Sequence, residues 1–312
     1  MYNAIVTMPP YAPHLAVVLR HPFVSGIRLN TVMPLERETP VAVVDRLAGE
    51  AQRFGKTLYV DLKTRQLRVK GLAVPPFTQV ELTHKITVRT PTTAYFGHGD
   101  ERTLVLAVEG NRLILATGPQ RGVGPGEAVN IPDPSLRVDG FFTESDLAYI
   151  DASAKVGAHD YMLSFTEDAA DISALLARDD AARPVAKIES ERGLAYVQSG
   201  WRGEARLMAA RGDLFVQIPP HRINDELEAI VRKDSTAIVG SRLLESLAQS
   251  DTPSCEDIGD VGNLLRTGFS TFMFGDQIAF HYERILSGLN LVELLAMTYE
   301  RNKTSAVRAE KY

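Results

Sequence analysis

The sequence lacks several features that would define a class of protein at once. It has a single cysteine, Cys255, so it can form no internal disulfide and nothing indicates an oxidising compartment. No apolar run approaches the roughly 18 residues of a membrane span, and the first residues do not resemble a signal peptide. There is no positive excess, because 34 basic residues face 39 acidic ones. A net charge of -5 argues against nucleic acid or an anionic membrane as a partner, since both require a cationic face.

What is present is the composition of an ordinary globular protein. Apolar residues make up 45% of the chain and charged residues 23%, so a substantial core can be buried. A length of 312 residues suits one large domain or two ordinary ones. We therefore expect a soluble cytoplasmic protein, either an enzyme or a remnant of one.

Short apolar segments alternate with amphipathic ones along most of the chain. Eight segments rich in β-branched residues are typical of buried strands: 4–8, 27–30, 57–61, 161–165, 184–188, 206–210, 237–240 and 271–274. Helical periodicity is found between most of them, at residues 41–54, 145–156, 169–177, 191–199, 224–233, 256–266 and 277–299. This alternation predicts a parallel sheet, and eight strands in that order predict an α/β fold of the (β/α)8 TIM barrel type.

One segment, residues 69–133, interrupts the alternation. It contains no convincing helix, and residues 80–89, 104–108 and 112–116 are typical of strands. We therefore predict a barrel made of residues 1–68 and 134–312. A small β lid subdomain, residues 69–133, is inserted after the third barrel strand.

Charged residues follow the predicted barrel strands, where the active site of a parallel barrel lies. Glu189 and Asp213 come at the ends of strands five and six, so their carboxylates should be neighbours. Two such carboxylates repel each other unless a cation lies between them, and with water they suit Mg²⁺. Lys187 points to the same side as Glu189 and suits a substrate with developing negative charge, such as an enolate or phosphoryl group. The structural alternative is a buried ion network without a catalytic role.

Other polar residues at strand ends leave two interpretations open. Arg28 contacts either a ligand or Asp61, and Asn30 either binds a ligand or caps a loop. Arg68, at the base of the predicted lid, either reaches an anion or holds the lid in place. Ser241 brings a hydroxyl to the end of strand seven. A single hydroxyl there does not distinguish a functional role from a structural one.

Taken in order, these segments resemble the pyruvate kinase family. The residues that carry the resemblance are AKIESERG at 186–193, MAARGDLFVQIP at 208–219, LES at 244–246, DVGN at 260–263, RLN at 28–30, DLK at 61–63 with Arg68, and AVNIP at 128–132. Each is short, but their order and spacing agree along most of the chain. The resemblance implies a barrel for phosphoenolpyruvate or pyruvate, with a lid after strand three.

The resemblance also implies roles for individual residues. Glu189 and Asp213 match the protein ligands of a divalent metal, Mg²⁺ or Mn²⁺. Lys187 matches the lysine that stabilises the phosphoryl or enolate transition state, and Arg28 an arginine that contacts the phosphoryl group. Ser241 replaces a threonine near the substrate.

Three further matches concern binding. The backbone of Arg211, Gly212 and Asp213 matches the turn that binds the substrate carboxylate. Arg68 matches an arginine on the substrate side. Asn30 and Asp61 match ligands of a monovalent cation, K⁺.

The departures from the family lie on the nucleotide and K⁺ side. Residues 32–34 read Val-Met-Pro where the family has Ser-His-Gly, which removes a hydroxyl ligand of K⁺ and makes K⁺ binding doubtful. Glu127 stands at the lid position of a lysine, so nucleotide binding is also doubtful. Gln66 replaces an acid, and Glu167 replaces the arginine that follows Ser-Phe. The lid is shorter than in the family, and the sequence ends before the family's C-terminal domain.

The residues therefore leave three functions open. The first is a Mg²⁺-dependent, pyruvate kinase-like enzyme that acts on phosphoenolpyruvate, pyruvate or a related 2-oxo acid. The second is a lyase or aldolase of the related barrel superfamily, which would use the same metal to hold a pyruvate enolate. The third is a non-catalytic ligand-binding relative. Assembly into a homo-oligomer is left open as well.

Overall fold

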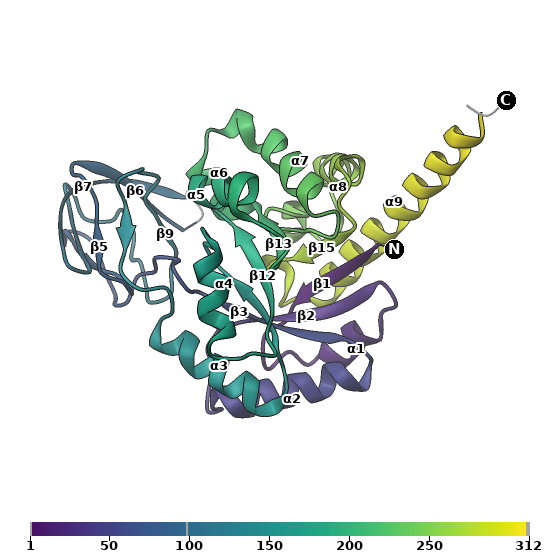
Figure 1. The fold of residues 1–312 in the computed structure, drawn as a ribbon, viewed down its shortest axis with the longest axis horizontal. Helices are drawn as coiled ribbons and strands as arrows, with labels where there is room; N and C mark the ends of the chain where they lie inside the picture. The colour runs from purple at the N-terminus through teal and green to yellow at the C-terminus, as the bar shows by residue number, and fades with distance from the viewer. Residues whose placement is uncertain (1, 98, 310–312) are drawn as a thin grey trace.

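The computed structural model describes residues 2–97 and 99–309, and in this part of the chain eight parallel strands close into a barrel (Figure 1). Each predicted strand overlaps one of the observed strands, which confirms the (β/α)8 barrel. Around the barrel the order is β1-β15-β14-β13-β12-β11-β3-β2. The strands are β1 (Asn3–Thr7), β2 (Val24–Asn30), β3 (Thr57–Leu62), β11 (Asp160–Leu163), β12 (Arg183–Ile188), β13 (Arg206–Ala210), β14 (Ile238–Gly240) and β15 (Thr271–Phe274).

Helices cover the outside of the barrel, and the last helix projects away from it (Figure 1). They are α1 (Leu15–Arg20), α2 (Pro40–Arg53), α3 (Glu144–Val156), α4 (Ala169–Leu176), α5 (Glu191–Ala195), α6 (Arg211–Gln217), α7 (Ile223–Lys233), α8 (Cys255–Thr267) and α9 (Tyr282–Ala309). Local sequence sets several of their ends. Thr143 and Asp146 form a capping box at the start of α3, and Gly157 ends it in the left-handed conformation.

Four helical segments differ from the prediction. The short helices α1 and α6 were missed, because one or two turns carry too little periodicity to detect. The helix predicted from residue 277 begins at Tyr282, since Asp276–Ile278 forms a 3-10 turn first. The predicted helix 191–199 is α-helical only to Ala195 and continues as a π-helical turn, Tyr196–Gly200.

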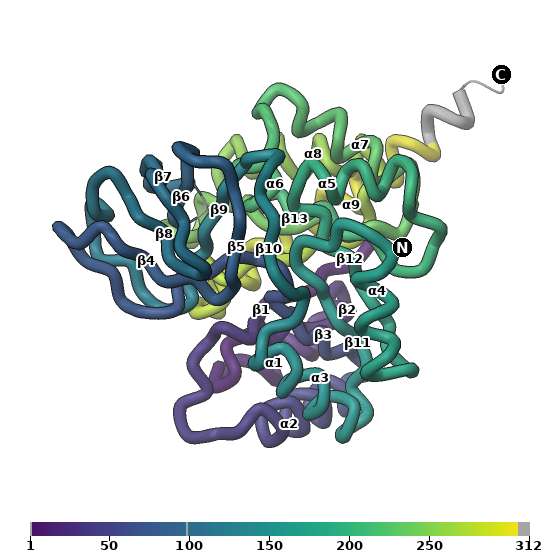
Figure 2. The backbone as a smooth tube through the Cα atoms, turned by 60° about the vertical axis from the view of Figure 1, so that its left-hand side comes forward, coloured from purple at the N-terminus to yellow at the C-terminus, as the bar shows by residue number. Residues whose placement is uncertain are grey.

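An all-β subdomain stands beside the barrel between β3 and α3 (Figure 2). Five of its strands form an antiparallel sheet in the order β4-β8-β7-β6-β9: β4 (Gln79–Glu81), β8 (Arg112–Leu115), β7 (Glu101–Glu109), β6 (Thr92–Phe96) and β9 (Val129–Asn130). A second pair joins β5 (Ile86–Thr87) to β10 (Arg137–Val138). The limits 69–133 that we expected for this lid stay a prediction, and the β10 pairing lies beyond them.

Barrel and lid have separate cores. The lid packs around Val80, Phe96, Val105 and Leu113. The barrel interior is filled by a small cluster that includes Ile5, Met162, Val185, Met208 and Met273. A larger cluster lies between the strands and the surrounding helices. The filled interior leaves the carboxyl ends of the strands as the place where polar side chains gather.

Candidate active site

A cavity of about 420 Å³ lies where the carboxyl ends of the barrel strands face the lid. Most of the side chains that the sequence singled out line it. They are Arg28, Asn30, Arg68, Lys187, Glu189, Asp213 and Ser241, together with Gly212. The lid contributes Gly97, Gly126 and Glu127. The fold thus brings residues from six strand ends to one place.

Asp61 is a fully buried carboxylate that contacts three of the cationic side chains lining this cavity. Its Oδ2 accepts from Arg28 Nε at 2.8 Å and from Lys63 Nζ at 2.7 Å, and Arg28 Nη2 also donates to it. Lys187 Nζ lies 3.4 Å from Oδ1. Burial alone would raise the pKa of Asp61, but Arg28, Lys187 and Lys63 outweigh burial and hold this pKa well below its usual value. Asp61 is therefore the fixed negative charge that allows three cations to be buried.

Lys187 is held between two carboxylates. Its Nζ lies 3.1 Å from Glu189 Oε1 and donates to Ser164 Oγ at 2.8 Å, in addition to the contact with Asp61. Burial would lower the pKa of Lys187, but Asp61 and Glu189 outweigh it, so the pKa is raised. The lysine is thus a permanent positive charge with little freedom to move.

Glu189 is oriented by backbone as well as by Lys187. Its Oε2 accepts from the amide of Phe165 at 2.8 Å. Phe165 has a φ of 49°, in the left-handed region that costs energy for a residue with a side chain. Burial raises the pKa of Glu189, Lys187 opposes this rise, and Asp213 adds to it. The two carboxylates line the same cavity.

Asp213 is held by two amide side chains. Gln66 Nε2 donates to its Oδ2 at 2.7 Å, and Asn130 Nδ2 donates to its Oδ1 at 2.8 Å. Asn130 in turn accepts from Gln217 Nε2 at 2.7 Å. Sequence reasoning missed Asn130 and Gln217 as site residues. The signal was present for Asn130, which lies inside the AVNIP segment.

Glu189 and Asp213 fit a divalent cation by their chemistry. Both are buried and both line the cavity, and burial, with a smaller contribution from Asp213, raises the pKa of Glu189. Within the described ranges no group of three or more His, Cys, Asp or Glu side chains is arranged to hold a metal ion. The pair therefore suits an ion such as Mg²⁺, which binds proteins through one or two carboxylates and keeps water or substrate oxygens as its other ligands.

Positively charged side chains also line this cavity. Arg28, Lys63, Arg68 and Lys187 all line it. Lys63, which the sequence did not single out as a site residue, has its pKa lowered to about 7 by burial and by neighbouring cations, although Asp61 opposes this. Arg68 also holds the lid, because it donates to Gln66 Oε1 at 3.0 Å and to the carbonyl of Gly126. Arg68 therefore holds the lid, as the second interpretation expects, whereas its contact with an anion stays a prediction.

The side chain of Arg211 points away from this wall. It forms a two-pronged ion pair with Asp260 at 2.7 and 2.8 Å and donates to the carbonyls of Ser241 and Arg242. Only the residues after it, Gly212 and Asp213, line the cavity. Any part that Arg211 plays in binding is therefore through its backbone and through the support of the loop after β14.

The residues expected to bind a monovalent cation are engaged by protein groups. Asn30 Nδ2 donates to Asp276 Oδ2 at 2.9 Å, and Arg28 Nη1 lies 3.3 Å from Asp276 Oδ1. Asp61 already faces three cationic side chains. Asp276 was not identified from the sequence, because it lies between the last predicted strand, 271–274, and the helix predicted from residue 277, in what the structure shows to be a 3-10 turn.

The lid side of the cavity carries a partly exposed ion pair, in contrast to the buried charges on the barrel side. Glu127 pairs with Arg121, whose Nη1 lies 3.1 Å from Glu127 Oε2, and Arg121 Nε lies 3.8 Å from Glu101. Arg121 is 46% exposed and Glu127 19% exposed. The negative charge expected at position 127 is thus present and is partly neutralised by a surface arginine.

The fold and the site together define a parallel barrel with a lid and a cavity lined by two buried carboxylates and several cationic side chains. The family model described as pyruvate kinase, barrel domain, matches residues 80–281. That match covers more than half of the chain, which therefore belongs to the pyruvate kinase family.

Similar proteins agree with this assignment. A pyruvate kinase from Agrobacterium vitis is 27% identical over 186 residues, which are 58% of this chain and 38% of that protein. One from Borreliella burgdorferi is 21% identical over 288 residues, 82% of this chain and 59% of that protein. The chain thus spans well under two thirds of the length of these relatives.

Solved structures show the same fold. Cryptosporidium parvum pyruvate kinase has a TM-score of 0.77 at 17% identity, with 96% of this chain and 71% of that chain covered. The same enzyme in complex with ADP has a TM-score of 0.78. In addition, no helix of the described residues is long and apolar enough to cross a membrane.

Proposed function

We propose that this protein is a Mg²⁺- or Mn²⁺-dependent enzyme that acts on phosphoenolpyruvate, pyruvate or a related 2-oxo acid through an enolate or phosphoryl-transfer step. The observation that supports this most is the position of Lys187. It is fixed between Asp61 and Glu189 and lines the same cavity as Asp213. A preorganised charge of this kind stabilises negative charge that develops in a transition state.

Each part of the cavity would have its own task. Glu189 and Asp213 would hold the metal, which when bound would polarise the oxygens of an oxo acid. Arg28, Arg68 and Lys63 would attract the anionic groups of the substrate. The backbone of Gly212 and Asp213 would face its carboxylate, and Ser241 would add a hydroxyl. Phe165 and Asn130 would orient the two carboxylates by hydrogen bonds to them.

ADP-linked phosphoryl transfer is the less favoured form of this activity. A lid that offers free cations would stabilise the phosphates of a nucleotide, whereas here the cavity meets the Glu127 carboxylate and an arginine already paired with it. This observation favours the second candidate, a lyase or aldolase that uses the metal and Lys187 to hold an enolate and needs no nucleotide. The substrate remains a small 2-oxo acid in both cases. A cytoplasmic location and a homo-oligomer stay predictions.

The proposal is tested by calorimetric titration with Mn²⁺ and with oxalate, a planar dianion that resembles enolpyruvate. Wild type should bind Mn²⁺, and oxalate should bind more tightly when Mn²⁺ is present. Glu189→Gln should weaken Mn²⁺ binding by at least about tenfold, as the loss of a group that holds or orients a metal does. The control, Glu228→Gln, changes an exposed glutamate on α7 that pairs with Arg232. Equal Mn²⁺ affinity in wild type and Glu189→Gln would refute the metal assignment.

A further inference from the structure

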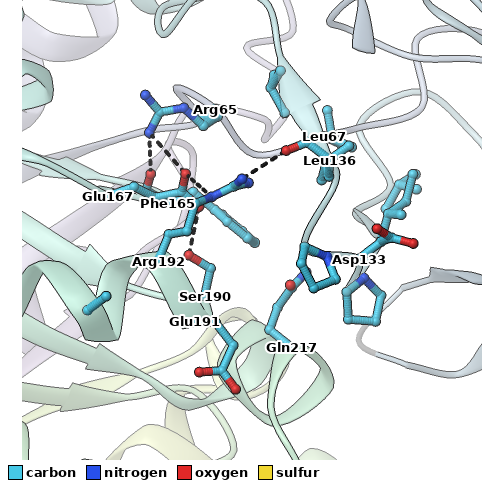
Figure 3. Close-up of a pocket in the computed structure, with 16 residues that line it drawn as sticks. Arg65, Leu67, Asp133, Leu136, Phe165, Glu167, Ser190, Glu191, Arg192 and Gln217 are labelled. Atoms are coloured by element: carbon cyan, nitrogen blue, oxygen red, sulfur yellow. Dashed lines mark hydrogen bonds and ion pairs between the residues drawn. The ribbon is translucent and has the colours of Figure 1, made fainter. Parts of the chain in front are cut away.

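A second pocket, of about 220 Å³, lies next to the catalytic cavity where the lid joins the barrel (Figure 3). Both connections between lid and barrel line it: the first through Arg65 and Leu67, the second through the segment from Val129 to Leu136. The barrel contributes Phe165 and the start of α5. A molecule in this pocket would therefore touch both lid connections and a barrel loop at the same time.

Phe165 connects this pocket to one of the proposed metal ligands. Its side chain lines the pocket, while its backbone amide donates to Glu189 Oε2 at 2.8 Å. The φ of 49° at this residue places the amide there at a cost in backbone energy. A shift of the Phe165 backbone together with its ring would therefore alter the hydrogen bond that orients Glu189.

Gln217 connects the pocket to the other carboxylate. Its side chain lines the pocket, and its Nε2 donates to Asn130 Oδ1 at 2.7 Å. Asn130 Nδ2 then donates to Asp213 Oδ1 at 2.8 Å. Each of the two carboxylates is thus one or two hydrogen bonds away from the same pocket.

The lining indicates the chemistry of the ligand. The walls are mostly apolar, with Leu67, Ile131, Leu136 and Phe165 among them (Figure 3). The charged side chains that line the pocket already have partners within the protein. Glu191 pairs with Arg222, and Asp133 accepts from Thr92 and Ser135. Arg65 pairs with Asp171, and Glu167 pairs with Arg192 at 2.9 Å and accepts from Ser190. Charges that are already paired do not call for a charged ligand.

The volume of the pocket limits the size of the ligand that it can bind. An apolar cavity of about 150 Å³ accepts benzene in another protein, so a volume of about 220 Å³ suits one or two fused rings. A helix or a strand of another protein is too large for it.

We propose that this pocket binds a neutral, ring-sized apolar molecule and that its occupant tightens divalent metal binding at Glu189 and Asp213. The pocket exists together with both hydrogen-bond connections, so a ligand that fills it favours the arrangement in which the carboxylates are oriented. The coupling rests on the proposed metal site, whereas binding in the pocket does not.

Indole is a suitable probe, and its binding to the metal-free protein tests the pocket alone. Wild type should bind indole saturably and more tightly than indole-3-carboxylate, which carries a charge. Ala195→Phe enlarges an exposed side chain that lines the pocket, and should weaken indole by about tenfold or more, a change that corresponds to 1.4 kcal/mol. Ala170→Phe, an exposed alanine on α4 outside the lining, should leave it unchanged. Three results would contradict the proposal that this pocket binds a neutral apolar ring. They are no saturable binding of indole by wild type, tighter binding of indole-3-carboxylate than of indole, and equal loss of indole affinity in Ala195→Phe and Ala170→Phe.

Titration of Mn²⁺ with and without saturating indole tests the coupling. Indole should tighten Mn²⁺ binding by about fivefold or more, the lower end of common coupling between sites. Gln217→Met keeps the size of the side chain and removes its donor, so indole should still bind while its effect on Mn²⁺ becomes smaller. Unchanged Mn²⁺ affinity in wild type would overturn the coupling. Failure of Mn²⁺ to bind either with or without indole would instead refute the proposed function, and the pocket would then be judged by the indole titration alone.

Discussion

The barrel side and the lid side of the cavity differ in how their charges are compensated. On the barrel side, Asp61, Lys187 and Glu189 have side chains at most 6% exposed, and each contacts at least one opposite charge. On the lid side, Glu127 and Arg121 form a pair that is 19% and 46% exposed. One side is thus a buried network and the other a partly hydrated surface pair.

This difference predicts how each side responds to substitution. Breaking a buried pair leaves an uncompensated charge in a medium that solvates it poorly, so the cost is large. An exposed pair contributes little to stability because water and salt screen it. Changes on the barrel side should therefore alter folding or catalysis, and changes on the lid side should alter which ligand charge is tolerated while the fold persists.

The largest effect is expected for Asp61→Asn. The substitution would leave Arg28, Lys63 and Lys187 without their shared carboxylate. We expect a loss of about 3–5 kcal/mol in the free energy of unfolding, the usual cost of removing one partner from a buried ion pair. Urea denaturation measures it, with Asp151→Asn as the control because Asp151 is 67% exposed in its pair with Arg178. If Asp61→Asn loses no more free energy of unfolding than Asp151→Asn, the three cations must be hydrated in the folded protein, contrary to this prediction.

Lys187→Met should come next, and should act on turnover. The methionine keeps most of the bulk of the side chain, so the barrel should fold and Mn²⁺ should still bind. Removal of a single preorganised donor costs on the order of 100–1000-fold in turnover in other enzymes. Proton exchange at the methyl group of pyruvate in heavy water reports enolisation without knowledge of the second substrate. Lys155→Met, on the exposed side of α3, is the control.

The outcomes of this exchange experiment separate the candidate functions. Metal-dependent exchange in wild type that falls sharply in Lys187→Met supports an enolate mechanism. Equal exchange in both proteins would show that Lys187 is not essential to enolisation. No exchange in wild type would favour the non-catalytic, ligand-binding alternative.

The barrel side was also the more predictable part of the site. Period-2 and period-3.6 patterns define the strands and helices, and a parallel barrel brings strand ends to one face, so Glu189, Lys187 and Asp213 followed from position alone. Asp276 did not follow, because it lies in a 3-10 turn whose path the periodicity does not encode. Asn130 did not follow, because its place depends on the pairing of β9 with β6 in the lid. Arg211 shows the same limit: its place after β13 was predicted, but not the ion pair with Asp260 that turns its side chain away.

The lid was predictable as a β subdomain but not in its electrostatics. The lack of helical periodicity indicated strands between β3 and α3, and the structure contains them. The sequence also placed a negative charge at Glu127. It did not reveal that Arg121, six positions earlier and across a loop, would pair with it. Side-chain partners across an irregular loop depend on backbone conformation that the residue types alone do not determine.

A smaller effect is expected for Glu127→Lys on the lid side. Wild type should show weak ADP binding and weak or absent ADP-linked turnover, because a carboxylate faces the phosphates. The substitution changes the local charge by two units and also releases Arg121, so ADP should bind more tightly by a few fold to about tenfold, as expected for partly screened charges. Calorimetric titration with ADP and Mg²⁺ measures this. Glu109→Lys, an exposed lid residue, controls for overall charge. Tight ADP binding by wild type would contradict the prediction that Glu127 on the lid side disfavours the phosphates of a nucleotide.

The smallest effect is expected when K⁺ replaces Na⁺, although Asn30 and Asp61 match the family's monovalent-cation ligands. Asp61 is already neutralised by Arg28, Lys63 and Lys187, and the amide nitrogen of Asn30 donates to Asp276. Val32 stands in a segment that lacks the family's hydroxyl ligand. A monovalent ion would have to displace buried ammonium and guanidinium groups that are held by direct contacts, and it would repel them as it approached. We therefore expect oxalate affinity in the presence of Mn²⁺ to change by less than about twofold, under half a kcal/mol, when K⁺ replaces Na⁺ at constant ionic strength. A tenfold gain with K⁺ would show that the cations around Asp61 rearrange when the substrate site is filled, and that this part of the barrel side resembles the family more closely than its resting contacts indicate.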